Sequence, residues 1–143
     1  MKTQGGFLIT RIKQVGGRVF ERILAEKKID AFNGAQGRIL YILWQKNGVP
    51  ISELSKESGL AMTTLTSMLD RMEAADLVRR SREDKDRRKV IIFLTAKARE
   101  LENDYNSVTE EISRIYYKDF SEEEIEQAEG YLLRILNNVE AVL

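Results

Sequence analysis

The stretch SELSKESGLAMTTLTSMLDRMEAADLVRRSREDKDRRKVIIFL, residues 52–94, decides the fold of this chain. Its first residues have the pattern of a short helix, which Gly59 ends by supplying a tight turn. A second helix is predicted from an apolar stripe at helical spacing, made of Leu65, Met68, Leu69 and Met72. Two helices joined by a short glycine-containing turn form a helix-turn-helix.

Two β-rich segments follow the second helix, at residues 77–81 and 89–94. The link between them is almost entirely charged, and residues 79–89 hold seven basic and three acidic side chains. A hairpin with a basic tip directly after a helix-turn-helix is a wing. The charge alone fits a solvated loop, but the order of elements favours nucleic-acid binding.

Three segments, ISELSKESGL, TTLTSMLDRMEAADLV and EDKDRRKVIIFLTAKA, resemble the multiple-antibiotic-resistance regulator (MarR) family of winged-helix repressors. The last is the most specific, because Asp86-Arg87-Arg88 precedes a β run and Thr95 opens a helix. The resemblance covers the whole chain and implies a mainly α (α+β) fold. It implies a single domain, residues 1–143, with a winged helix-turn-helix at about 33–95 and dimerisation helices at about 7–28 and 96–143.

The flanking segments also have helical patterns, and residues with capping side chains stand at their predicted starts. Further helices are predicted at residues 7–28, 34–46, 96–117 and 121–143, with Asn33, Ser52, Thr95 and Ser121 as N-caps and residues 47–50 as a turn.

The first and last of these helices carry more apolar surface than a small winged helix can cover. One interpretation is a helical hairpin within one chain. The other is a two-fold dimer that uses residues 7–24 and 121–143, and it is favoured because half-site recognition needs a symmetric pair.

Composition excludes several classes of function. The chain has no histidine, no cysteine and no glycine-rich phosphate loop, so no enzyme activity, cofactor or metal site is predicted. No apolar run approaches the length of a membrane span, and the N-terminus lacks a signal peptide pattern, so we expect a cytoplasmic protein.

The net charge of zero argues against a nucleic-acid partner, but the distribution of charge argues for one. Residues 1–47 carry a net charge of +6, residues 79–89 carry +4 and residues 96–143 carry −7. Binding depends on the field at the docking face rather than on the sum over the chain.

Hydroxyl-bearing residues cluster on the polar face of the second helix, near its start, where a recognition helix meets base edges. The candidates for DNA contact on this helix are Thr63, Thr64, Thr66, Ser67 and Arg71. A merely solvated face is less plausible, because threonine is a poor helix former.

The resemblance implies that Arg88 of the wing enters the minor groove while Asp86 orients its guanidinium. Lys85 and Arg87 flank the tip and are predicted to contact phosphates. The alternative is a surface pair of Asp86 and Arg88 that only holds the hairpin together. The chain departs from the family at Ala61, where a capping residue is usual, and at Ser67, where arginine is common.

Two functions are consistent with the sequence. The first is a dimeric repressor that binds a pseudopalindromic operator and is released by a small aromatic or lipophilic anion. The resemblance implies an effector pocket between the dimer helices and the winged helix, with Arg11, Val15, Phe32, Ile39 and Trp44 as candidate lining residues, each of which could instead belong to the core. The second is a winged-helix protein-interaction module without specific DNA binding.

Overall fold

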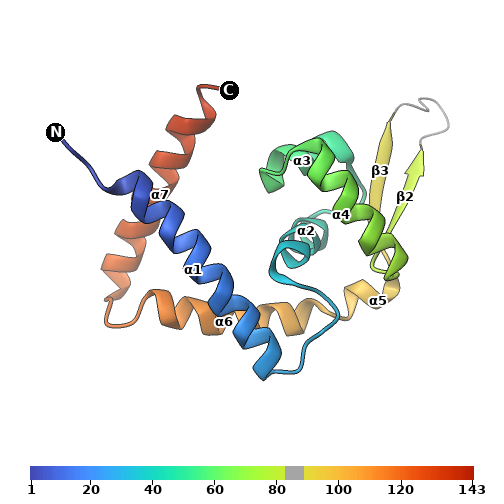
Figure 1. Ribbon diagram of the computed structural model, residues 1–143, viewed down its shortest axis with the longest axis horizontal. Coiled ribbons are helices and arrows are strands. Elements are labelled where there is room, and N and C mark those ends of the chain that lie inside the picture. The colour runs from blue at the N-terminus through green and yellow to red at the C-terminus, as the bar shows by residue number, and fades with distance from the viewer. Residues whose placement is uncertain (83–88) are drawn as a thin grey trace. The chain divides into compact units, whose positions relative to one another are not determined.

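Helices α3 (Ile51–Ser58) and α4 (Met62–Ala74) form the predicted helix-turn-helix in the computed structural model, which describes residues 1–82 and 89–143 (Figure 1). Gly59 ends α3 in the left-handed conformation, with φ at +73°, as the turn prediction required. The four residues of the predicted apolar stripe on α4 are buried. The mainly α fold with a small sheet is therefore confirmed.

A three-stranded antiparallel sheet accompanies the helix-turn-helix, with strands β1 (Val49–Pro50), β2 (Val78–Arg82) and β3 (Val90–Leu94) in the order β1-β3-β2. The turn predicted at residues 47–50 is confirmed at Asn47 and Gly48 but ends earlier than predicted, because Val49 and Pro50 form β1 and Val49 pairs with Ile92 of β3. Pro50 is tolerated in β1 because a proline, which has no N–H to donate, fits an edge strand. The paired β2 and β3 form the wing.

Three of the four predicted caps are confirmed. Asn33 and Ser121 each form a capping box, with Gln36 and Glu124 respectively, and the Thr95 side chain accepts a hydrogen bond from the Ala98 amide. Ser52 was wrong as a cap: α3 begins at Ile51, so the cap position falls on Pro50, whose side chain accepts no hydrogen bond. The helix starts early because the chain passes directly from β1 into α3.

The other helices are α1 (Gly5–Glu26), α2 (Gly34–Gln45), α5 (Ala96–Arg99), α6 (Glu102–Tyr116) and α7 (Glu122–Glu140). The single helix predicted over 96–117 is divided into α5 and α6. At the division, the Leu101 amide donates to the Ala98 carbonyl oxygen in a tightened turn. That oxygen also accepts the indole N–H of Trp44, at 3.1 Å, so a contact from α2 reinforces the division.

The chain divides into two compact units, Met1–Thr109 and Glu110–Leu143, and the prediction of a single domain stays a prediction. The first unit has a core drawn from α2, α3, α4 and the sheet. Its fully buried large side chains include Ile39, Leu40, Leu43, Leu54, Leu65, Leu69, Met72, Leu77 and Ile92. None of the helices in the described ranges is long and apolar enough to cross a membrane.

In the second unit, the turn between α6 and α7 is held by aromatic and polar contacts. The rings of Tyr117 and Phe120 pack edge to face, with centroids 5.6 Å apart. The Tyr117 hydroxyl donates to a carboxylate oxygen of Glu129 at 2.9 Å. All residues of α7 lie in the described part of the chain, and none of them is buried.

Gly48 and Gly59 allow the cost of a left-handed backbone to be separated from the cost of a clash. Both have positive φ, but a Cβ at Gly48 would lie 2.9 Å from Cε1 of Phe93, whereas a Cβ at Gly59 would meet nothing within 4 Å. We expect Gly59→Ala to lower the free energy of unfolding by about 1 kcal/mol. Gly48→Ala should lower it by roughly 2 kcal/mol, because the Phe93 ring must also move. Urea denaturation of both variants checks this, and equal losses would contradict it.

Candidate nucleic-acid interface

The polar face of α4 is exposed along its first turns. Burial of the apolar stripe on the opposite face leaves Thr63, Thr64, Thr66 and Ser67 accessible, and Arg71 is exposed one turn further on. Five of the predicted contact residues therefore share one accessible helix surface. Their contact with DNA stays a prediction.

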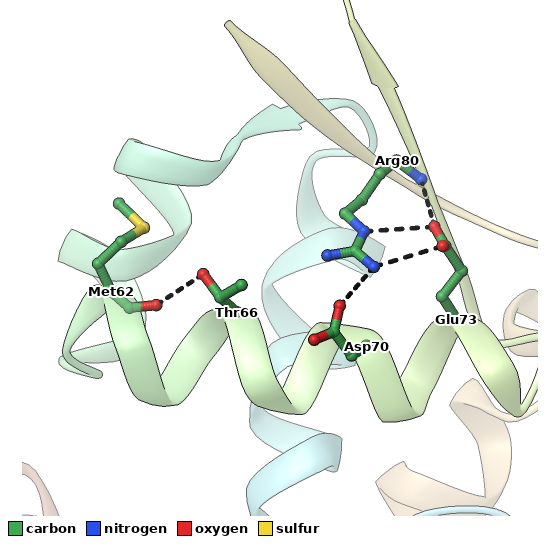
Figure 2. A network of polar contacts seen from close by, with 5 residues as sticks. All are labelled: Met62, Thr66, Asp70, Glu73 and Arg80. Atoms are coloured by element: carbon green, nitrogen blue, oxygen red, sulfur yellow. Dashed lines mark hydrogen bonds and ion pairs between the residues drawn. The ribbon is translucent and has the colours of Figure 1, made fainter. Parts of the chain in front are cut away.

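Thr66 makes a hydrogen bond that limits what it can offer to a ligand. Its hydroxyl donates to the Met62 carbonyl oxygen at 2.8 Å, one turn earlier in α4 (Figure 2). The hydroxyl proton is engaged within the helix. The Thr66 side chain therefore presents two features outward: a methyl group, and an oxygen that can accept a hydrogen bond. A thymine methyl or an amino donor on a base edge suits such a surface.

The start of α4 has the weak cap that its sequence predicted. Ala61 occupies the N-cap position in an extended conformation and makes no side-chain hydrogen bond to the helix. The first amides of α4 therefore lack a side-chain acceptor from their own cap, and the positive end of the helix dipole lies beside the threonines.

A network of polar contacts that the sequence did not reveal joins α4 to the wing (Figure 2). A terminal guanidinium nitrogen of Arg80 on β2 lies 2.6 Å from Oδ1 of Asp70 and 3.4 Å from Oε1 of Glu73. Oε2 of Glu73 accepts from the Arg80 backbone N–H at 3.1 Å and from its Nε at 3.4 Å. The hint in the sequence was the acidic pair at spacing i, i+3 on α4, but nothing local linked it to Arg80.

The charges in this network stabilise one another. The hydrogen bond from the Arg80 side chain is the largest cause that holds the pKa of Glu73 below its ordinary value, and the bond from the Arg80 backbone adds to it. Hydrogen bonds to Glu73 and then Asp70 raise the pKa of Arg80. The Glu73 carboxylate and the Arg80 guanidinium are therefore both ionised at neutral pH.

The four candidates at the wing tip, Lys85, Asp86, Arg87 and Arg88, lie outside the described residues. The strands that lead to the tip are described: Arg82 ends β2 and pairs with Val90, the first residue of β3. The expected roles of the tip residues stay predictions.

The five candidate effector residues fall into different environments. Arg11 and Val15 are exposed on α1, whereas Phe32 and Ile39 are buried. Trp44 is partly buried, and its indole is engaged by Ala98. The ring of Tyr105 lies 6.0 Å from that of Phe32 and 5.4 Å from that of Trp44, measured between centroids.

Tyr105 of α6 is a residue that the sequence did not identify as part of the candidate site. Its ring packs against four others, from Phe20, Phe32, Tyr41 and Trp44. Desolvation by this cluster raises the pKa of the Tyr105 phenol. The structure brings two of the five effector candidates to this aromatic cluster, and their role in binding a ligand stays a prediction.

Comparison with known proteins gives consistent results for this region. Residues 32–90 match the family model described as MarR family. The HTH-type transcriptional regulator TtmR of Methylorubrum extorquens strain PA1 is 38% identical over 85 residues, which are 59% of this chain and 42% of that protein. The match therefore spans less than half of that relative.

Two solved structures are similar over almost the whole chain. A MarR transcriptional regulator from Methanosarcina mazei Go1 has a TM-score of 0.88 at 21% identity, over 99% of this chain and 100% of that one, and it supports the fold. BpsR of Bordetella bronchiseptica, described as a protein whose DNA binding is regulated by 6-hydroxynicotinic acid, has a TM-score of 0.80 at 25% identity, over 94% of this chain and 99% of that one. The match over residues 32–90 identifies this part of the chain as a MarR family winged helix, and the two structures support the same fold over almost the whole chain.

Proposed function

We propose that this chain is a DNA-binding transcription regulator that places α4 in the major groove. The observation that carries the proposal is the exposed row of hydroxyl side chains on α4 beside a basic hairpin. Threonine and serine side chains at the start of an exposed helix suit base-edge and phosphate contacts. BpsR, a relative with regulated DNA binding, supports this proposal.

The wing completes the proposed interface. In the proposal, Arg88 enters the minor groove, Asp86 orients it, and Lys85 and Arg87 bind phosphates. A narrow minor groove concentrates negative potential and so attracts an inserted arginine. The net charge of +4 over residues 79–89 supports this placement, despite the zero net charge of the chain.

We further propose that the active form is a homodimer. Helix α1 exposes Phe7, Leu8 and Ile12, and α7 separately exposes Leu132, Leu136 and Val139. Each helix alone thus presents large apolar side chains to solvent, at fractions from 48% to 68% of their full exposure. A second copy of the chain is the proposed cover, because a two-fold pair places two recognition helices on two half-sites.

The proposed regulator is a repressor that a small aromatic or lipophilic anion releases from its operator. The regulation of BpsR by 6-hydroxynicotinic acid supports an effector of this class. Such a ligand acts only by binding a non-DNA-binding geometry more tightly than the DNA-binding one. Phe32 and Trp44, beside Tyr105, are the candidate contacts that the structure supports best.

The first test is selection of bound duplexes from a random-sequence pool. We expect enrichment of a pseudopalindrome with half-sites about one helical turn apart, because a two-fold dimer presents two equivalent recognition helices. Affinity for the selected duplex should fall steeply with salt, as counterions are released from phosphates. A pool that shows no enriched motif, with weak binding insensitive to salt, would favour a protein-interaction module instead.

A second test concerns the wing. We expect Arg88→Ala to leave the circular dichroism spectrum unchanged and to weaken binding of the selected duplex. The salt slope, which is the steepness of the logarithm of the binding constant against the logarithm of the salt concentration, should fall by about one unit per subunit. Arg38→Ala is the matched control, because Arg38 carries the same charge at an exposed position of α2, outside the wing and outside the proposed dimer interface. An Arg88→Ala variant with a lowered melting temperature but normal DNA binding would support the alternative, in which Asp86 and Arg88 form a surface pair that only holds the hairpin together.

A third test concerns assembly. Leu132→Asp should dissociate the dimer, raising its dissociation constant by at least about 100-fold, because it buries an unpaired charge in the interface. Asn137→Asp adds the same charge to α7 at a polar exposed position and should leave the dimer intact. Sedimentation equilibrium measures both variants. A folded wild-type monomer at micromolar concentration would rule out the dimer.

A further inference from the structure

We infer that Arg80 is a positioning residue for DNA recognition, which fixes the wing to the recognition helix through Asp70 and Glu73 and does not itself contact DNA. The inference rests on the proposed function, because it concerns how α4 and the wing are held in register for two neighbouring grooves. It assigns a role to three residues that the sequence analysis did not place in the interface.

The first argument is that the attachment involves both the side chain and the backbone of Arg80. The guanidinium contacts Asp70 and Glu73, which stand one turn apart on α4. Glu73 also accepts the backbone N–H of Arg80. A contact to the side chain alone would leave the strand free to slide or rotate, whereas the added backbone bond fixes the strand itself to the helix.

The second argument is that β2 is an edge strand. In the order β1-β3-β2, only one side of β2 has a partner among the strands that the structure describes. The backbone N–H of Arg80 would otherwise face solvent, and Glu73 takes the place of the missing partner. A side chain of the recognition helix therefore completes the hydrogen bonding of the strand that leads into the wing tip.

The third argument is the contrast between neighbouring arginines. The Arg80 side chain is 26% exposed, whereas that of Arg79 is 75% exposed and approaches a single carboxylate, Asp76, at 3.9 Å. The two differ because alternate residues of a strand point to opposite faces. Arg80 is thus directed at α4, and its charge is already matched by two carboxylates.

The fourth argument concerns those carboxylates. Asp70 follows Thr66 by one turn and lies on the same side of α4 (Figure 2). An uncompensated carboxylate there would repel DNA phosphates. Arg80 neutralises part of this charge while it holds the wing, so both effects of the residue favour binding.

The test is a mutant cycle measured by equilibrium binding to the duplex that the selection recovers, at several salt concentrations. We expect Arg80→Gln to weaken binding about fivefold, roughly 1 kcal/mol. The salt slope should change by much less than about one unit per subunit, because no phosphate contact is lost and salt screens only the repulsion from the uncovered carboxylates. In the Asp70→Asn/Glu73→Gln background, the same substitution should change affinity less than about twofold, because the charges it acts through are gone.

Arg79→Gln is the matched control, since it removes the same charge one residue away on β2. Its effect should be the same in the wild-type and Asp70→Asn/Glu73→Gln backgrounds. Arg80→Lys keeps the charge but cannot form the guanidinium fork, so it should also weaken binding. If Arg80→Gln fails to fold by circular dichroism, Arg80→Lys carries the test.

Several outcomes overturn the inference. In the first, Arg80→Gln lowers the salt slope by about one unit per subunit and loses as much affinity in the Asp70→Asn/Glu73→Gln background as in the wild type. That result would show that Arg80 contacts a phosphate directly. Wild-type affinity in Arg80→Gln or in Arg80→Lys would show that the attachment is dispensable. A wild-type chain that prefers no duplex would instead overturn the proposed function, and the role of Arg80 with it.

Discussion

The burial of one face of α4 is the constraint on which the candidate interface depends. Leu65, Leu69 and Met72 are fully buried, so the rotation of the helix about its axis is fixed by packing. That rotation turns the hydroxyl side chains outward. The chemistry of the exposed face is therefore a consequence of the core, and a polar residue placed in the stripe would disturb the candidate interface and the stability of the fold together.

The C-terminal end of α4 is fixed by hydrogen bonds, as its buried face is fixed by packing. Asp76 adopts a positive φ of 59° just beyond the helix, and the Leu77 amide donates to the Met72 carbonyl oxygen. The Thr95 hydroxyl then donates to the Asp76 carbonyl oxygen at 2.7 Å, while it also caps α5. One side chain thus connects the end of α4 to the start of α5, which relates the helix of the candidate interface to the elements that follow the sheet.

Local charge accounts for the proposed DNA partner, which the total charge does not suggest. The basic hairpin is separated along the sequence from the acidic C-terminal third of the chain. The net charge of zero is therefore the sum of regions with opposite charge, each of which produces its own local electrostatic field. Within the winged helix, Arg80 is withdrawn from that basic surface by Asp70 and Glu73. A count of basic residues in the hairpin therefore overstates the number of cations free to meet phosphate, and the structure identifies one that is already occupied.

The sequence by itself determined what depends on neighbours along the chain. The apolar stripe of α4, the turn at Gly59 and the caps at Asn33, Thr95 and Ser121 are set by periodicity, backbone freedom and hydrogen bonds over a few residues, and they were confirmed. These local features already placed the hydroxyl side chains on an exposed face.

Only the tertiary structure decided what depends on residues distant in the sequence. Strand β1 exists because Val49 meets Ile92, and α5 ends where Trp44 binds the Ala98 carbonyl oxygen. The Arg80 network needs α4 and β2 to be packed before its atoms meet. Such contacts have no periodic signature, because their geometry is fixed only after the core has brought the elements together.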